Sequence, residues 1–151
     1  MKVMFVASSG GHFEELMCLR TLMEKYESIL ITEAGGQAED SSIVIDYTFS
    51  QINRKERHLL SHFLHLCKCA RSILKKEKPD IIISTGALLT FPFCLYGKIL
   101  GKKIVYIESF ARIDNLSCTG RLVYLFADLF LVQWHTLAKR YSKARYVGCV
   151  F

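Results

Sequence analysis

The sequence predicts an α/β protein whose core is a doubly wound, Rossmann-like parallel sheet. Short apolar runs alternate with segments of helical periodicity along the chain, which is the pattern that βα units produce. Runs such as 81–83 and 104–107 are continuously apolar and rich in β-branched residues, as expected for parallel strands covered on both faces. A length of 151 residues with 51% hydrophobic side chains fits one buried core, so we expect a single domain over residues 1–151.

The expected elements alternate in type from one end of the chain to the other. The expected strands are 2–7, 28–33, 43–47, 80–84, 103–107, 128–132 and 144–147. The expected helices are 12–26, 56–77, 90–100, 119–126 and 134–141. The carboxyl ends of parallel strands meet at one edge of the sheet, and ligands of such sheets bind at that edge. Polar residues directly after the strands are therefore the candidates for a functional site.

The turn after the first strand is the strongest candidate for a binding loop. Ser8, Ser9, Gly10 and Gly11 lead into His12 at the start of a helical segment. Glycines allow backbone N–H groups to point at one place, the helix start adds partial positive charge, and serine hydroxyls can donate to an anion. This pattern favours a phosphate or pyrophosphate ligand with His12 beside it. A tight strand-to-helix connection with nothing bound is the competing interpretation.

Two further strand ends carry polar turns. Thr85 and Gly86 follow the fourth strand, and Glu108 and Arg112 follow the fifth. Taken singly, a glycine turn is typical of packing, and a carboxylate four residues from a guanidinium is typical of a surface ion pair. Because all three turns lie at one edge of the sheet, we expect a crevice with phosphate-binding loops, a carboxylate and a fixed cation.

A dinucleotide site is an alternative for the first loop. Glu33 ends the second strand about twenty residues after Gly11, where a ribose-binding acid is found in dinucleotide folds. The loop lacks the GxGxxG spacing, however, since Phe13, Glu14 and Glu15 follow the glycines. Acids in the first helical turn would repel a pyrophosphate that they faced, so a stand-alone dinucleotide-binding protein is the weaker hypothesis.

Charge and cysteine content limit the partners. The formal net charge of +6 favours phosphorylated substrates, anionic lipid headgroups or nucleic acid. The six cysteines show no CxxC spacing, so reduced thiols are expected. One helical stripe carries potential metal ligands, namely His58, His62, His65 and Cys69. Ser72 and Lys76 continue that stripe, and we interpret it as the polar face of an amphipathic helix that binds no metal.

Several motifs together resemble a known family. They are Ser8–His12, Ser84–Pro92, Tyr106–Arg112, Leu116–Arg121 and Ala127–Trp134. They are similar to the acceptor-side, membrane-associating subunit of the two-component glycosyltransferases, whose relatives serve asparagine-linked glycosylation in eukaryotes and capsule or exopolysaccharide assembly in bacteria. The layout also resembles, more remotely, the N-terminal half of the peptidoglycan lipid-linked N-acetylglucosaminyltransferase.

The resemblance implies the N-terminal half of a GT-B glycosyltransferase, with the donor site for a UDP-sugar on a separate small subunit. The chain is then expected to bind a polyprenyl-pyrophosphate-linked sugar acceptor, without cofactor or nucleic acid, and to transfer no sugar alone. Acceptor contacts are expected from Ser9, Gly10, Gly11, Thr85, Gly86, Arg112 and Ser117. His12 is the first candidate for catalytic base, because imidazole titrates near neutral pH, and Glu108 is the second. A non-catalytic anchor and activator of the partner enzyme is the alternative.

Two surfaces are expected to make contacts outside the domain. Tyr146, Val150 and Phe151 form an apolar tail that we expect to dock on the catalytic subunit, against the alternative that it packs on its own sheet. No spanning helix is expected, so a cytoplasmic protein lying on the inner face of the plasma membrane is predicted. The aromatic and lysine-flanked helix at 90–100 is the candidate for membrane contact, and a core-packed helix is the alternative.

Overall fold

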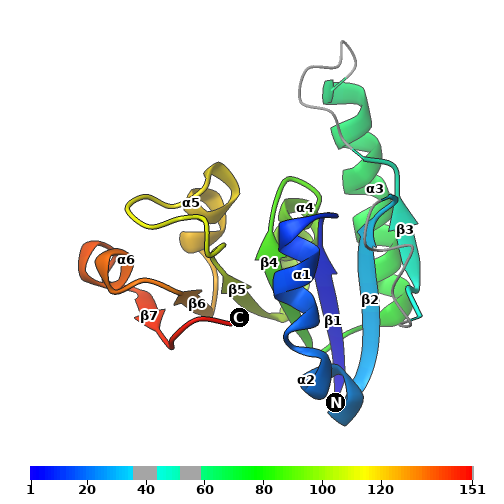
Figure 1. Cartoon of the computed structure of the whole chain (residues 1–151). Helices are drawn as coiled ribbons and strands as arrows, with labels where there is room; N and C mark the ends of the chain where they lie inside the picture. Colours follow the sequence, from blue (N-terminus) through cyan, green and yellow to red (C-terminus); the bar gives the residue numbers. More distant parts are fainter. Residues whose placement is uncertain (36–43, 52–58, 151) are drawn as a thin grey trace.

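The computed structural model describes residues 1–35, 44–51 and 59–150, and its centre is one parallel sheet (Figure 1). The strand order is β3-β2-β1-β4-β5-β6-β7, and every neighbouring pair is parallel. The strands are β1 (Lys2–Ala7), β2 (Glu27–Glu33), β3 (Tyr47–Phe49), β4 (Ile81–Gly86), β5 (Lys103–Ile107), β6 (Leu129–Val132) and β7 (Ala144–Tyr146). This order confirms the predicted Rossmann-like fold.

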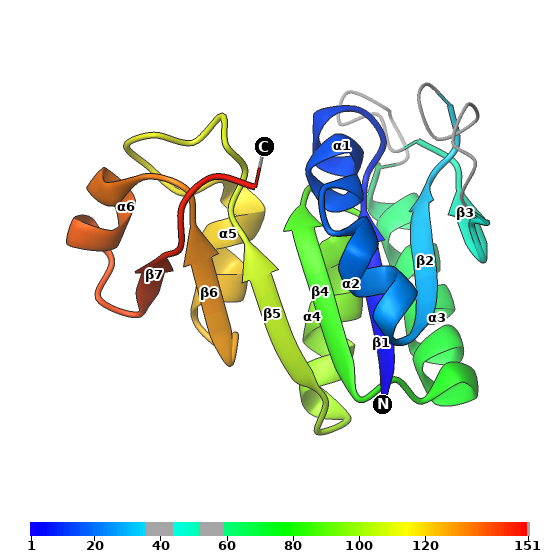
Figure 2. The same ribbon diagram turned by 60° about the horizontal axis from the view of Figure 1, so that its bottom comes forward.

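Helices cover both faces of the sheet, so the sheet is doubly wound. The helices are α1 (Gly11–Met17), α2 (Arg20–Lys25), α3 (Leu59–Glu77), α4 (Thr90–Ile99), α5 (Cys118–Tyr124) and α6 (His135–Arg140). Figure 2 shows α1 and α2 on one face, with α3, α4 and α5 behind the other. Two apolar clusters result, because inward side chains of each strand alternate between the two faces. Phe5 and Phe13 belong to the α1 side, and Phe93 and Tyr106 belong to the α4 side.

Two elements differ from the sequence prediction. The helix expected over 12–26 is two helices, because the chain tightens at Leu19, whose amide donates to the Leu16 carbonyl at 2.9 Å. The strand expected over 43–47 is displaced to Tyr47–Phe49. Before Tyr47, the Asp46 carboxylate accepts the Leu30 amide at 2.8 Å, so a side chain replaces the strand ladder there. Position 43 and positions 56–58 of the expected α3 lie outside the described residues.

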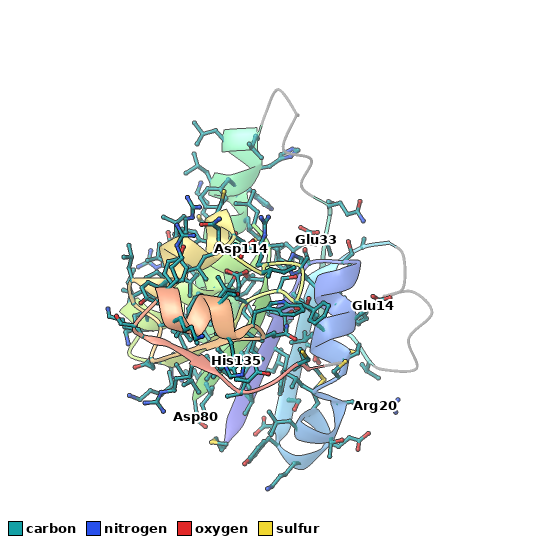
Figure 3. All side chains as sticks on the ribbon, turned by 60° about the vertical axis from the view of Figure 1, so that its left-hand side comes forward. Glu14, Arg20, Glu33, Asp80, Asp114 and His135 are labelled. Carbon is teal, nitrogen blue, oxygen red and sulfur yellow. The ribbon has the colours of Figure 1, made fainter. Side chains whose placement is uncertain are left out.

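Aspartates at the amino edge of the sheet cap neighbouring strands. Asp80, directly before β4, accepts the Lys2 amide at 2.8 Å, and Asp128, directly before β6, accepts the Ile104 amide at 2.9 Å. Asp46, directly before the short strand β3, accepts the amide of Leu30 in the middle of β2. These carboxylates satisfy backbone donors that the ladder leaves open. Figure 3 shows Asp80 at the end of the molecule opposite to Glu33 and Asp114, which lie toward the carboxyl edge.

A charged cluster at the amino edge makes stability depend on acid pH. Glu77 accepts from Lys2 Nζ at 2.8 Å and from Tyr47 Oη at 2.6 Å, and these bonds lower the pKa of Glu77 to about 2. The ionised carboxylate therefore stabilises the fold above the usual carboxyl range, and this contribution is lost as pH falls toward 2. We expect Glu77→Gln to lower the free energy of unfolding at pH 6 and to match wild type near pH 2, in urea titrations. Glu27→Gln, at an exposed partner of Lys2, is the control and should change little.

Candidate functional site

The candidate site lies where the strand order reverses. The chain winds from β1 toward β3 in one direction and from β4 toward β7 in the other, so β1 and β4 are neighbours although long stretches of sequence separate them. In open α/β sheets the loops after two such strands diverge to opposite faces and leave a crevice at the carboxyl edge. The structure therefore brings the glycine loop after β1 together with the Thr85–Gly86 turn that ends β4, as the sequence predicts.

The glycine loop is open to solvent on its outer side. Gly10 has φ 78° and ψ −145°, a conformation that favours glycine. A Cβ atom placed on Gly10 or Gly11 would meet nothing within 4 Å, so a ligand can approach this backbone closely. The hydroxyl of Ser9 accepts a hydrogen bond from Gln51 Nε2 at 3.0 Å, which ties the loop to the segment after β3.

His12 is held in place by Thr85. The imidazole Nδ1 lies 2.9 Å from the Thr85 carbonyl oxygen, and the Thr85 hydroxyl donates to the His12 carbonyl at 2.7 Å. A carbonyl oxygen can only accept, so Nδ1 carries the hydrogen and Nε2 is the basic nitrogen of the neutral ring. Thr85 is fully buried and its hydroxyl is used by His12, while its expected contact with the acceptor stays a prediction. The structure gives Thr85 the role of orienting His12.

Gly86 is required by the close approach of two side chains. A Cβ atom there would lie 3.0 Å from Tyr106 Oη and 3.2 Å from His12 Cε1, and φ is +116°. The next residue, Ala87, has φ 72°, which strains a non-glycine backbone. Tyr106 Oη is buried without a hydrogen-bond partner among the described residues. Burial, together with the charge of Glu108, raises the pKa of Tyr106. The Tyr106 hydroxyl beneath the turn therefore stays protonated.

Glu108 is a buried anchor of the loop that follows β5. Its side chain is fully buried, Oε1 accepts from the Ser109 amide at 3.1 Å, and Oε2 accepts from the amide and hydroxyl of Ser117 at 3.0 and 3.2 Å. Burial raises the pKa of Glu108. A Cβ atom on Gly120 would overlap Oε2, so α5 packs directly over the carboxylate. This geometry favours a positioning role over the catalytic role expected for Glu108.

Ser117 also has a structural role that the sequence did not indicate. It is the N-cap of α5, and its hydroxyl accepts from the Gly120 amide at 2.9 Å while it donates to Glu108. Both functions of the hydroxyl are therefore used within the protein. Ser117 thus positions α5 and Glu108, and its expected contact with the sugar acceptor stays a prediction.

Arg112 is exposed on a loop that α6 holds in place. The indole of Trp134 donates to the Phe110 carbonyl at 2.7 Å, the Thr136 hydroxyl donates to the Ile113 carbonyl, and Arg140 donates to the Asp114 carbonyl at 3.1 Å. Three side chains thus fix the backbone on either side of Arg112. A guanidinium on a fixed loop at the carboxyl edge of the sheet is suited to an anionic ligand.

A second buried network contains residues that sequence reasoning missed as site residues. Glu15, only 3% exposed, accepts from the Ser109 hydroxyl at 2.8 Å and from the Phe110 amide at 2.9 Å. Gln133 donates to the Glu108 carbonyl at 3.1 Å. Glu15 therefore faces the β5 loop and not the glycine loop, although it lies in the first helical turns. A polar residue directly after the apolar run of β6 was the available signal for Gln133.

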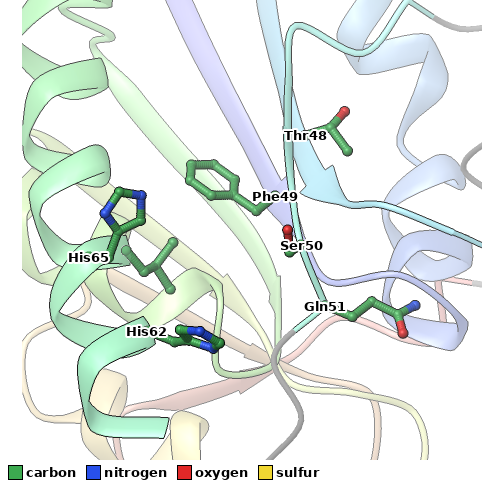
Figure 4. Close-up of a pocket in the computed structure, with 7 residues that line it drawn as sticks. Thr48, Phe49, Ser50, Gln51, His62 and His65 are labelled. Atoms are coloured by element: carbon green, nitrogen blue, oxygen red, sulfur yellow. The ribbon is translucent and has the colours of Figure 1, made fainter. Parts of the chain in front are cut away.

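The histidine stripe of α3 faces a groove. His62 and His65 line a cavity of about 440 Å³ together with Thr48, Phe49, Ser50, Gln51 and Leu66 (Figure 4). Cys69 Sγ lies 3.4 Å from His65 Nε2. Part of the stripe thus lines this groove, and both histidines are also exposed to solvent. Within the described ranges, no group of three metal-binding side chains is found, and His58 lies outside those ranges.

The helix expected to touch a membrane is mainly part of the core. In α4, Phe93 is fully buried, and Phe91 stacks on Phe63 and meets Phe126 edge to face. Ile99, at the end of α4, is 68% exposed, and Leu100 after it is 37% exposed. Among residues 1–35, 44–51 and 59–150, none of the helices has the length and hydropathy needed to cross a bilayer.

The C-terminal segment returns to the carboxyl edge of the sheet. The Val150 amide donates to Gln133 Oε1 at 2.9 Å, and Cys149 Sγ donates to the Gln133 carbonyl at 3.7 Å. Tyr146 is 39% exposed, and its ring packs on the His135 ring with centroids 3.7 Å apart and a tilt of 32°. Val147 is 62% exposed. The tail is therefore held on its own sheet at one end and exposes apolar side chains at the other, while Phe151 lies outside the described residues.

The strand order and the crevice at the switch point define a Rossmann-like, doubly wound domain. The fold resembles the UDP-GlcNAc 2-epimerase of Methanocaldococcus jannaschii, with a TM-score of 0.76, 16% identity, and cover of 99% of this chain and 46% of that chain. It also resembles Acinetobacter baumannii MurG, with a TM-score of 0.72, 16% identity, and cover of 89% and 42%. The chain thus spans about half the length of these solved structures, and the likeness concerns the fold alone.

The chain belongs to the Alg14 family: the family described as "Oligosaccharide biosynthesis protein Alg14 like" matches residues 56–150. The human UDP-N-acetylglucosamine transferase subunit ALG14 is 28% identical, over 98% of this chain and 82% of its own length. The same subunit of Kluyveromyces lactis is 30% identical, over 97% and 77%. A 77-residue match to the Schizosaccharomyces pombe subunit is 48% identical and covers 48% of this chain and 37% of that protein. The expected family is confirmed.

Proposed function

We propose that this chain is the acceptor-binding subunit of a heteromeric glycosyltransferase in oligosaccharide or polysaccharide biosynthesis. Membership of the Alg14 family, whose relatives are named as transferase subunits, supports the subunit role. The observation that carries acceptor binding is the junction of the open glycine loop with the Thr85–Gly86 turn, where His12 is clamped in one orientation. The ligand that this junction suits is a sugar linked through pyrophosphate to a polyprenyl chain.

In the proposed mechanism the acceptor pyrophosphate lies against the glycine-loop backbone and Arg112. Because Nδ1 of His12 donates to Thr85, Nε2 takes the proton of the attacking acceptor hydroxyl. The acceptor oxygen then forms a bond to the anomeric carbon of the donor sugar. The bond from that carbon to the nucleotide phosphate breaks, and the nucleoside diphosphate leaves with the electron pair. The donor, a UDP-sugar, is held by the partner subunit.

The site of acceptor binding can be tested directly on the reconstituted complex. We expect Arg112→Gln to weaken binding of a short-chain polyprenyl-pyrophosphate sugar by about tenfold or more, because the variant loses a charge-assisted contact to phosphate. Isothermal titration of the complex with this acceptor measures the effect. Arg121→Gln, on an exposed face of α5, is the matched control. Equal affinity in both variants would place the acceptor elsewhere.

A non-catalytic anchor and activator is the second candidate function. The exposed apolar side chains of Tyr146 and Val147 favour a partner-docking role that needs no acceptor site. An anchor would tolerate loss of His12 as long as the complex forms. The dinucleotide alternative is weaker, because Glu33 is only 7% exposed and the glycine spacing is absent.

Docking of the partner on the tail predicts a selective loss of assembly. Val147→Asp places a charge on the exposed apolar surface that we propose to be covered, together with Tyr146, Val150 and Phe151. We expect the variant to fold normally and to recover at most about a tenth of the partner in co-purification, since a buried unpaired charge is strongly unfavourable. Val44→Asp is the control, because Val44 is 82% exposed near the opposite edge of the sheet. Full recovery with both variants contradicts docking at the tail.

Assignment to capsule or exopolysaccharide assembly, and to the inner face of the plasma membrane, is a finer proposal. The relatives reported above are eukaryotic subunits, so they support the transferase role without choosing the product. A screen of nucleotide-sugars and lipid-linked acceptors with the co-expressed partner tests the product, and vesicle flotation of the complex tests the membrane contact.

A further inference from the structure

Gln133 joins three parts of the molecule that lie far apart in the sequence. Its side chain is 1% exposed and directly follows β6. Nε2 donates to the Glu108 carbonyl at 3.1 Å and lies 3.5 Å from Glu15 Oε2. Oε1 accepts from the Val150 amide at 2.9 Å. One buried side chain therefore contacts α1, the end of β5 and the C-terminal tail.

The Gln133 amide satisfies this set of contacts because it carries both a donor and an acceptor. Toward the β5 side the neighbours of Gln133 are a carbonyl and a carboxylate, which accept and require a donor. Toward the tail the neighbour is the N–H of Val150, which requires an acceptor. A carboxylate at this position has no proton to donate at neutral pH, and a lysine or arginine has no acceptor. The orientation of the amide is thus set from both sides, and moving one side disturbs the other.

The two ends of this connection are the two surfaces to which the proposed function assigns different ligands. Glu15 holds the Ser109 hydroxyl and the Phe110 amide, and the Ser109 carbonyl accepts the Arg112 amide at 2.9 Å. At the other end, Gly148 has φ +90°, a conformation that allows the tail to turn between exposed Val147 and the bonded Val150. The path from the tail to Arg112 is therefore a chain of hydrogen bonds, and the groups at its centre, Gln133 and Glu15, are buried.

We propose that Gln133 is a positioning residue that couples docking of the catalytic subunit on the tail to the geometry of the acceptor loop, residues 108–112. This inference rests on the proposed function. When the partner covers the tail, the hydrogen bond between the Val150 amide and Gln133 is fixed in one geometry. Gln133 then fixes the position of the loop that carries Arg112. Coupling between two sites is reciprocal, so bound acceptor must also tighten association with the partner by the same factor.

The first test follows the tail in the isolated chain. Alkylation of Cys149, which is exposed and donates to the Gln133 carbonyl, is measured by mass spectrometry with exposed Cys18 as internal reference. We expect Gln133→Leu to raise the alkylation rate of Cys149 at least threefold while the rate of Cys18 is unchanged. Gln133→Glu keeps an acceptor for Val150 but places a carboxylate against Glu15 and the Glu108 carbonyl, so the coupling of the two sides predicts that its Cys149 rate also rises. Equal rates in wild type and Gln133→Leu would overturn the proposal.

The second test measures coupling in the assembled protein. Affinity for the short-chain lipid pyrophosphate sugar is compared with and without saturating partner subunit, and we expect at least a fivefold tightening in wild type. Val150→Pro removes the N–H that bonds Gln133 and leaves the buried carboxylates untouched, so it should reduce this factor to near one. Val150→Ala retains the N–H, and should retain the factor while weakening partner association.

The outcomes separate the two proposals. A wild-type complex that binds no acceptor overturns the proposed function. A wild-type complex that binds acceptor equally well with and without partner leaves the proposed function in place and overturns the coupling. If Val150→Pro and Gln133→Leu both keep the full tightening of acceptor affinity by the partner, the coupling does not pass through Gln133. That result also overturns the inference.

Discussion

We expect His12→Ala to lower kcat for sugar transfer by about 10²- to 10⁴-fold in the reconstituted complex, which is the range that a positioned general base contributes. Its imidazole is held by the Thr85 carbonyl at 2.9 Å, so the ring presents a single basic nitrogen. The substitution removes a half-buried side chain at the mouth of the crevice, outside both apolar clusters. Thermal unfolding and partner recovery should therefore remain near wild type, while steady-state kinetics show the loss in kcat.

Thr85 provides a matched pair of variants for the same hypothesis. Thr85→Val has a similar shape and loses the hydroxyl that donates to the His12 carbonyl at 2.7 Å, whereas Thr85→Ser keeps it. We expect Thr85→Val to lower kcat by a larger factor than it raises KM, because the base is misoriented. Thr85→Ser should recover most of the wild-type kcat. If His12→Ala transfers sugar at the wild-type rate in an intact complex, the chain is an anchor and the catalytic group lies on the partner.

The sequence was sufficient to place the loops but not the side chains within them. Alternation of βα units and the order of a doubly wound sheet bring residues 8–12 and 84–87 to one edge, and the structure confirms this. What the hydroxyl of Thr85 contacts depends on the twist of β1 against β4 and on the irregular register at Ala7 and Gly86. Such details arise from tertiary packing, which periodicity does not record.

The predicted and observed roles of the site residues differ mainly because residues near the ends of the strands are buried. Glu108 is expected at a ligand because three polar turns share one edge of the sheet, and Ser117 because of the family resemblance. In the structure, the segment between them folds back so that α5 covers the carboxylate. Glu15 was interpreted from its position near a helix start, although its side chain extends across to the β5 loop. In each case, a long-range contact decides the role, and a single sequence carries no direct signal of it.

The final prediction concerns Glu108, for which the structure changes the expected effect of substitution on folding. The position of Glu108 outside the apolar runs of the sequence predicts that Glu108→Ala folds normally. The carboxylate accepts from Ser109 and from two groups of Ser117, so removing it leaves buried donors unsatisfied. We expect a loss of about 2–3 kcal/mol in the free energy of unfolding, measured by urea denaturation.

Glu108→Gln separates a positioning role from a catalytic one. If Glu108 positions the loop, the amide oxygen retains part of the hydrogen bonding, and kcat should stay within about tenfold of wild type at neutral pH. If Glu108 is the base, the amide cannot take a proton, and kcat should fall by about 10²-fold or more. We expect the first result, because both carboxylate oxygens already accept bonds within the protein. The second result would restore Glu108 as the base and require the loop to open during the reaction.

The pH dependence of stability gives an independent check on the same group. Burial raises the pKa of Glu108 above its usual value of 4.5, so in this range the folded state binds more protons than the unfolded state. The stabilising contribution of the protonated form is complete below pH 4.5 and is lost as pH rises through the raised pKa. Glu108→Gln has no such titration, so the stability of wild type relative to this variant should fall from pH 4 to pH 8. Glu15→Gln should show the same sign, because burial also raises the pKa of Glu15. The pKa of Glu77 is lowered to about 2, so the stability of wild type relative to Glu77→Gln should instead rise with pH below the usual value of 4.5 and stay nearly constant above it. A wild-type-to-variant difference that stays constant over this range would mean that the Glu108 carboxylate is as well solvated in the folded protein as in the unfolded chain.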